Sequence, residues 1–175
     1  MTHRNPNPRR RPAWRRSILS AAALCAIAAP ALAHVAAEPR QAAAGAYQVI
    51  TFRVGHGCGP AATTALRVEL PLALGSARPR PKPGWKLSLE RDGERVTAVI
   101  WSGELPGDQF DEFAILARLP GQAGPLYFPT VQTCGAQQAR WTEIPGDGGV
   151  AGSLAHPAPV LLVTSPQGVA EAHSH

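Results

Sequence analysis

Short runs that alternate between hydrophobic and polar residues dominate the chain from residue 47 onward. In residues 47–54, Ile50, Phe52 and Val54 are separated by single polar residues, the two-residue period of a strand with one buried face. No amphipathic helix of ordinary length is evident. Similar runs are separated by turn residues, and we expect further strands at 65–70, 85–90, 95–101, 110–119, 126–132, 137–144 and 160–163.

Turn signals divide these runs at fairly regular intervals. Asp92-Gly93 between two alternating runs is typical of a β-hairpin. Residues 77–84 carry three prolines at every second position, which cannot donate central ladder hydrogen bonds, so this segment is expected to be an extended loop or a sheet edge. The pattern predicts an all-β chain, a single-domain antiparallel β-sandwich of the immunoglobulin or cupredoxin type.

The first 33 residues have the organisation of an export signal. Six arginines precede an apolar, alanine-rich stretch at 18–29, which is too short to span a bilayer as a stable helix. The sequence Ala31-Leu32-Ala33 is a small-x-small cleavage site, so His34 is expected to become the first residue. Arg15-Arg16 also resembles a twin-arginine signal, which leaves both export routes open. Leu24 before Cys25 does not fit a lipoprotein signal.

Three segments are therefore predicted: a signal peptide at 1–33, a β-sandwich domain at 34–145, and a Gly/Pro-rich linker with a mobile tail at 146–175. Cleavage predicts a periplasmic or secreted protein. We expect no membrane anchor after cleavage, because no second hydrophobic stretch resembles a membrane span.

Removal of the signal reverses the sign of the net charge. The whole chain has 17 basic and 12 acidic residues, and six of the basic ones lie in the signal. The processed chain would carry 11 basic and 12 acidic residues, a net charge of −1. The high isoelectric point therefore gives no support for nucleic-acid binding, which needs a basic patch on the folded domain.

Two cysteines, Cys58 and Cys134, follow the signal. In an exported protein an even pair is most simply a disulfide. A thiolate metal site is the alternative, and it ranks lower because the two residues do not form a CxxC pair.

His34 is the first candidate for chemistry. At a chain terminus its α-amine and its imidazole can hold one metal ion together, and imidazole nitrogen suits copper, nickel or zinc. The competing interpretation is a frayed terminus. Of the other histidines, His56 is expected to hydrogen-bond a tight turn beside the cysteine, and His156 to lie in a flexible region. The tail histidines, His173 and His175, would bind metal only weakly.

Carboxylates are the next candidate ligands. Asp111 and Glu112 open a predicted strand and should point to opposite faces. Glu143 follows Trp141 by two residues, so the two share a face if 137–144 is a strand. Such a pair could form one side of a metal site. The simpler interpretations are that Trp141 packs in the core and that Glu143 is exposed to solvent at its rim. The chain has no HExxH or GxSxG motif, which argues against zinc or serine hydrolases.

Taken together, the motifs resemble the YcnI-like domain, an exported bacterial copper-binding module. The matching stretches, in chain order, are His34-Val35, Ala44-Gly45-Ala46-Tyr47, Phe52-Arg53-Val54-Gly55-His56-Gly57-Cys58, Pro81-Lys82-Pro83-Gly84-Trp85, Trp101-Ser102-Gly103-Glu104-Leu105-Pro106, Asp111-Glu112-Phe113, Leu126-Tyr127-Phe128-Pro129, Val131-Gln132-Thr133-Cys134 and Trp141-Thr142-Glu143-Ile144-Pro145. They cover most of the predicted domain. Gly55 departs from the pattern, where a proline is expected before the turn.

The resemblance implies a β-sandwich with a copper(II) site on the N-terminal histidine, a brace with one histidine. It implies that His34 supplies two nitrogens, that an acidic residue completes the site, and that a tryptophan lies close by. Carried onto this sequence, Glu112 is the first choice of acid, Glu143 is the reserve, and Trp141 is the tryptophan.

The predicted function is copper(II) binding for copper handling or delivery, without catalysis, with another envelope copper-handling protein as a possible partner. The sole methionine, Met1, leaves with the signal, so the processed chain lacks the soft ligands that copper(I) prefers. Two alternatives remain open: a copper-dependent oxidase or oxygenase, and an envelope interaction module without a metal.

Overall fold

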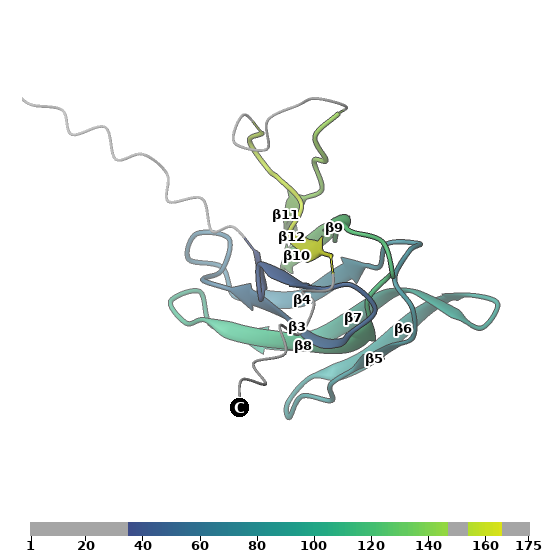
Figure 1. Ribbon diagram of the computed structural model, residues 1–175. Helices are drawn as coiled ribbons and strands as arrows, with labels where there is room; N and C mark the ends of the chain where they lie inside the picture. Colours follow the sequence, from purple (N-terminus) through teal and green to yellow (C-terminus); the bar gives the residue numbers. More distant parts are fainter. Residues whose placement is uncertain (1–34, 147–153, 166–175) are drawn as a thin grey trace, which may run out of the picture. The chain divides into compact units, whose positions relative to one another are not determined.

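The computed structural model describes residues 35–146 and 154–165, and these ranges contain strands but no helix (Figure 1). Within them, therefore, no helix is long and apolar enough to cross a membrane. The predicted signal peptide at 1–33, His34, and the tail histidines His173 and His175 lie outside the described residues.

The first of two main sheets has four antiparallel strands in the order β1 (Ala36–Glu38), β3 (Tyr47–Val54), β8 (Asp111–Arg118) and β5 (Ala77–Pro79). The register places Phe52 opposite Phe113 and Arg53 opposite Glu112. The proline-rich segment forms the edge strand β5, as the proline spacing predicted.

The second main sheet has five antiparallel strands. Their order is β11 (Gln137–Trp141), β10 (Thr130–Cys134), β4 (Thr63–Glu69), β7 (Arg95–Leu105) and β6 (Lys86–Asp92). β6 and β7 form the hairpin that Asp92-Gly93 predicted, and Gly93 has a φ of 59°, a backbone conformation that glycine adopts without strain.

A third, smaller sheet joins β2 (Gln41–Ala43), β12 (Val160–Thr164) and β9 (Gly124–Tyr127). β12 pairs in parallel with β2 and antiparallel with β9, and it buries Leu161 and Val163 in the core. The predicted domain end at 145 is therefore too early, because part of the expected linker closes this sheet.

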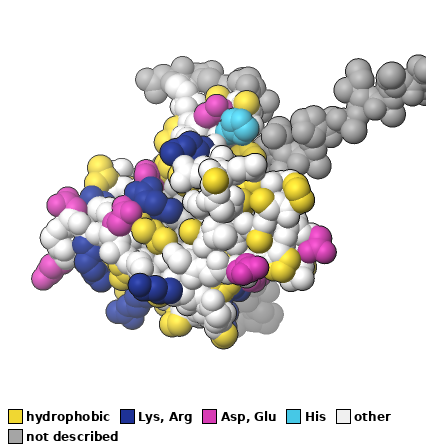
Figure 2. Space-filling view, turned by 180° about the vertical axis from the view of Figure 1, so that it is seen from behind, with side chains coloured by type: hydrophobic (Ala, Val, Ile, Leu, Met, Phe, Trp, Pro, Cys, Tyr) yellow, Lys and Arg dark blue, Asp and Glu magenta, His cyan; other side chains and the backbone are white. Residues whose placement is uncertain are grey.

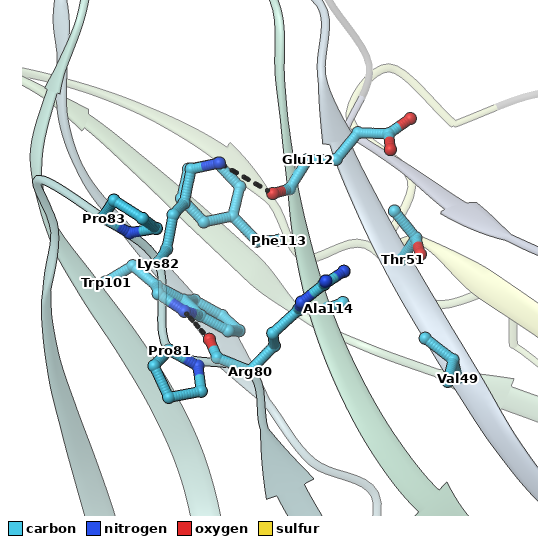
Figure 3. Close-up of a pocket in the computed structure, with 10 residues that line it drawn as sticks. All are labelled: Val49, Thr51, Arg80, Pro81, Lys82, Pro83, Trp101, Glu112, Phe113 and Ala114. Carbon is cyan, nitrogen blue, oxygen red and sulfur yellow. Dashed lines mark hydrogen bonds between the residues drawn. The ribbon is translucent and has the colours of Figure 1, made fainter.

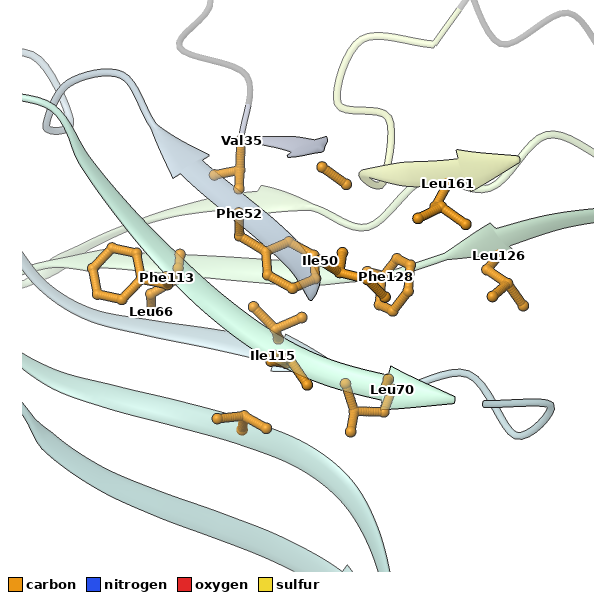
Figure 4. Packing of buried hydrophobic residues seen from close by; sticks show 14 of the residues in the cluster. Val35, Ile50, Phe52, Leu66, Leu70, Phe113, Ile115, Leu126, Phe128 and Leu161 are labelled. Carbon is orange, nitrogen blue, oxygen red and sulfur yellow. The ribbon is translucent and has the colours of Figure 1, made fainter. Parts of the chain in front are cut away.

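The core lies between the two main sheets and is closed by residues from the third (Figure 4). Trp101 of β7 contacts Phe113 of β8, with ring centroids 5.4 Å apart, so side chains from both main sheets meet. Phe52 and Phe128 make an edge-to-face contact at 5.3 Å. Each such fully buried side chain contributes roughly 1.5–3 kcal/mol of transfer free energy. The predicted β-sandwich is confirmed.

Several strand limits differ from the prediction. The run at 126–132 is two strands, β9 and β10, interrupted at Pro129, which has no N–H for a ladder. The strand expected at 137–144 ends at Trp141. The strands β1 and β2 were not predicted, because three residues are too few to display a period.

Acidic and basic side chains are interspersed on the surface face shown in Figure 2. Ion pairs among the described residues agree with this mixing. Arg67 lies 2.7 Å from Glu90 and 2.5 Å from Glu69, and Lys82 lies 2.5 Å from Asp111. Four basic side chains of the described domain are thus paired with nearby acids: Arg53, Arg67, Lys82 and Arg95.

Candidate metal centre

Val35 is the first residue that the structure describes, next to the predicted terminus. It directly follows His34, is only 3% exposed and belongs to the core cluster. Val35 also borders a cavity of about 360 Å³. Glu143 lines the same cavity. Most of the other lining residues are prolines or aliphatic residues, among them Ala37, Pro145, Pro157, Val160 and Leu162. The residue after His34 and one predicted acid are therefore brought to one place.

Trp141 is the last residue of β11 and lies two residues before Glu143 in the sequence. Its side chain is 3% exposed and packs into the core cluster, so the simpler interpretation of core packing is confirmed. The indole and the ring of His156 make an edge-to-face contact, with centroids 5.4 Å apart and planes at 66°. The tryptophan therefore links the core to the surface near Glu143.

Glu143 is held by two segments that run side by side. Its N–H donates to the carbonyl of His156 at 3.1 Å, and its own carbonyl accepts from the N–H of Ala158 at 2.8 Å. The N–H of His156 donates to Glu143 Oε2 at 2.8 Å. Among the described residues no hydrogen bond or ion pair engages Oε1 of Glu143, so that oxygen is available to a ligand.

His156 is the residue whose place was not predicted. It was expected in a flexible region, yet its backbone is bonded to Glu143 on both sides and its ring rests on Trp141. The side chain is exposed. A partial signal was present in Pro157, which restricts the preceding residue to extended backbone. We call Val35, Trp141, Glu143 and His156 the Glu143 region.

Glu112, the first-choice acid, lies in a different setting, on the outer face of the four-stranded sheet. Its carboxylate points away from Lys82 and Phe113 (Figure 3) and accepts from Arg53 Nε at 3.1 Å. Arg53 also holds both oxygens of Glu38 at 2.9 Å. The hydrogen bond to Glu112 and the charge of Glu38 raise the pKa of Arg53. Glu112 thus already shares the Arg53 cation with Glu38.

The disulfide between Cys58 and Cys134 is present, with Cα atoms 5.9 Å apart, as the cysteine pair predicted. His56 Nδ1 donates to the carbonyl of Gly57 at 2.7 Å, which is the turn role expected for it. The buried side-chain amide of Gln132 donates to the His56 carbonyl at 2.8 Å and to Thr63 Oγ1 at 2.7 Å. We call His56, Cys58, Thr63, Gln132 and Cys134 the disulfide region.

The described residues contain no group of three or more His, Cys, Asp or Glu side chains arranged to hold a metal ion. The Glu143 region supplies two donor side chains, an imidazole and a carboxylate. Two donors are too few for a tight site.

Comparisons with known proteins give the chain a family context. A family model described as a domain of unknown function, DUF1775, matches residues 34–163. The copper-binding protein CutI of Bacillus subtilis (strain 168) is 31% identical over 98 residues, or 54% of this chain and 48% of that protein. The chain therefore spans about half the length of that relative.

A solved structure is also similar. It is an uncharacterized protein from Nocardia farcinica, reported to have an immunoglobulin-like fold. The two chains are 36% identical with a TM-score of 0.63, and the match covers 75% of this chain and 98% of the other. The likeness agrees with the β-sandwich described above.

Proposed function

The chain belongs to the DUF1775 family, in line with the YcnI-like resemblance of its motifs, and we propose that it is an exported copper(II)-binding protein that handles copper without catalysing a reaction. The observation that carries the copper assignment is the similarity to a relative named as a copper-binding protein. Export rests on the signal-like residues 1–33 and on the small-x-small sequence before His34.

Two donors of the proposed site come from one residue. Cleavage after Ala33 frees the α-amine of His34, and this amine and the imidazole then bind one ion as a chelate. Nitrogen ligands of this kind suit copper(II), which stands highest among the divalent ions in affinity. When bound, the ion would be held for transfer to another envelope protein, a role for which no catalytic group is needed.

We assign the acidic ligand to Glu143, in place of Glu112. Glu143 lines the cavity that Val35 borders, and its Oε1 has no partner among the described residues. Glu112 is bound to Arg53, and binding a metal there would break a hydrogen-bonded ion pair. The chemistry of the donor set, imidazole, amine and carboxylate, fits copper(II). Trp141 supports the site as a rigid wall that connects it to the core.

The test compares two forms of the processed protein, one beginning at His34 and one with a single extra glycine before it. Copper(II) is titrated into each against a competing chelator. The proposal predicts one tight equivalent for the first form and loss of that equivalent for the second, because the extra residue removes the α-amine from the chelate. It also predicts weaker binding at lower pH, since both nitrogens must lose protons to bind. Equal affinities and equal copper spectra would contradict the proposal.

A further inference from the structure

The outer face of the four-stranded sheet has two halves of different character. At one end, Arg53 is paired with both Glu38 and Glu112, so the charges there are matched. Toward the other end the sheet carries apolar side chains that water reaches, since Tyr47 is 65% exposed and Val49 is 48% exposed. Exposed apolar side chains that adjoin one another on a surface are typical of a binding site for another molecule.

The register of the strands places arginines beside these apolar side chains. Arg118 of β8 lies opposite Tyr47 of β3, and Leu116 of β8 lies opposite Val49. Leu116 is itself 37% exposed, and its neighbour on the other side is Arg78 of the edge strand β5. Because alternate residues of a strand share one face, these side chains all project from the outer surface of the sheet.

Arg80 extends this arrangement along the sheet. It lies two residues after Arg78, a spacing of about 7 Å along a strand, and its N–H donates to the carbonyl of Ala114 at 2.8 Å. Its side chain extends across β8 toward Thr51 of β3 (Figure 3), and it lines a cavity of about 250 Å³ together with Val49, Thr51 and Ala114. A cation therefore adjoins the exposed apolar residues on this side as well.

The three arginines are not used in contacts within the fold. In the part of the chain that the structure describes, no ion pair or side-chain hydrogen bond engages Arg78, Arg80 or Arg118, and all three are exposed. Arg67 on the other main sheet differs, because Glu69 and Glu90 both bind it. This half of the outer face therefore offers positive charge and apolar area to a partner.

We propose that this half of the face docks an acidic segment of another protein. We call it the arginine face, and its residues are Tyr47, Val49, Arg78, Arg80, Leu116 and Arg118. Guanidinium groups bind carboxylates with a forked geometry, and tyrosine and arginine are enriched among the residues that contribute most to protein interfaces. This role goes beyond the proposed function and does not depend on copper.

Two other occupants fit the arginine face less well. A second copy of this chain in a two-fold interface would place the same arginines against one another, and like charges repel. An anionic lipid surface would attract the arginines. However, Val49 and Leu116 belong to the central strands β3 and β8, so they could enter lipid only together with the charged Arg53 and Glu112 of the same strands.

The experiment uses the protein processed to begin at His34, without metal. The probe is a short synthetic peptide with Glu at every second position and Ser or Leu between, and a peptide with Lys in place of Glu is the charge control. Binding is followed through the NMR signals of the backbone amides at low and high salt. The variant Arg78→Gln with Arg80→Gln is compared with Lys86→Gln with Arg140→Gln, which removes two positive charges from the five-stranded sheet. Thermal unfolding verifies that both variants are folded.

We expect the acidic peptide to shift the amide signals of β3, β5 and β8 and to bind more weakly at high salt, because exposed charges are screened. The Arg78 and Arg80 variant should bind roughly three- to tenfold more weakly, in keeping with the loss of two exposed ion pairs. The Lys86 and Arg140 variant should bind as the unaltered protein does, and the Lys peptide should not bind.

Absence of binding by the acidic peptide would overturn the proposal, and so would equal losses of affinity in the two variants. Binding of vesicles that contain phosphatidylglycerol, without binding of the peptide, would overturn it in favour of a membrane surface. Self-association of the protein that the Arg78 and Arg80 variant abolishes would overturn it in favour of a second copy of the chain.

Discussion

The disulfide region and the Glu143 region each contain a histidine, and the two histidines are used in opposite ways. In the disulfide region, His56 donates from its ring and accepts at its carbonyl, and the buried Gln132 joins it to Thr63. In the Glu143 region, His156 is tied only through its backbone, and its ring rests on Trp141. One region has its polar groups paired within the fold, and the other presents donors to the surface.

This contrast distinguishes the structural role of the disulfide region from the binding role that we propose for the Glu143 region. Buried polar groups that satisfy one another stabilise one arrangement of the chain, since leaving any of them unpaired costs free energy. Metal-ligating atoms that have no hydrogen-bond partner in the fold cost little folding free energy when they are exposed to water. Such atoms can bind a ligand without breaking a contact within the protein. Changes in the disulfide region should therefore alter stability, and changes in the Glu143 region should alter copper binding.

The largest expected effect comes from removing the disulfide with Cys58→Ser and Cys134→Ser together. The bond spans a sequence separation of 76 residues, and the chain-entropy model gives a loss of about 4.5 kcal/mol in the free energy of unfolding for a loop of this size. Denaturant titration measures the loss. Copper affinity of the folded double variant should be unchanged, and a variant of unaltered stability would refute the structural assignment.

A second change lies in the turn between His56 and Cys58 of the disulfide region, where Gly57 is replaced in Gly57→Ala. An added Cβ would lie 2.0 Å from the carbonyl oxygen of Ala61 and 2.9 Å from the Cα of Gly107, so the backbone has to move. We expect a loss of about 1–3 kcal/mol in unfolding free energy. Gly55→Ala is the matched control, because its Cβ meets nothing within 4 Å. Equal stability of the two variants would show that the turn tolerates movement.

The variants Glu143→Gln and Glu112→Gln test which of the two carboxylates binds copper(II). Glu143→Gln should weaken copper(II) binding by roughly ten- to a hundredfold, because the amide is neutral and a poorer ligand. Glu112→Gln should leave the affinity unchanged, since its carboxylate is bound to Arg53. Chelator competition on the processed protein measures both, and the reverse order of effects would restore Glu112 as the ligand.

The smallest effect concerns an ion pair outside both regions. The hydrogen bond from Arg67 lowers the pKa of Glu90 below its ordinary value of 4.5. The stability that this pair contributes is therefore present above pH 4.5 and is lost as the pH falls through the lower, folded-state value. Glu90→Gln should cost about 0.5 kcal/mol at pH 7 and less at pH 3, because the pair is largely exposed. A larger difference at pH 3 than at pH 7 would contradict this sign.

Much of the fold could be predicted from local patterns. The alternation of Ile50, Phe52 and Val54 predicted which face of β3 is buried, and Asp92-Gly93 predicted the hairpin. These features depend on neighbouring residues in the sequence. Strands of three residues, such as β1 and β2, have no period to detect. The strand at 160–163 was predicted, but its pairing with β2 and β9 is a contact between distant segments that the sequence pattern does not reveal.

The candidate site was harder to predict, for the same physical reason. Trp141 and Glu143 were identified from their spacing, but the strand that was to place them on one face ends at Trp141. Hydrogen bonds to His156 hold Glu143 instead. Such a contact between chain segments leaves no spacing signal. Glu112 was placed correctly on a strand, whereas its partner Arg53 follows only from the register of β3 and β8.

The measurement that tests the central claim most directly is the intact mass of the protein exported by a cell that expresses the full sequence, supported by N-terminal sequencing. The account predicts a chain that begins at His34 with a free α-amine. A chain that begins at any other residue would contradict it, because the terminal amine and the His34 imidazole would no longer belong to the same residue.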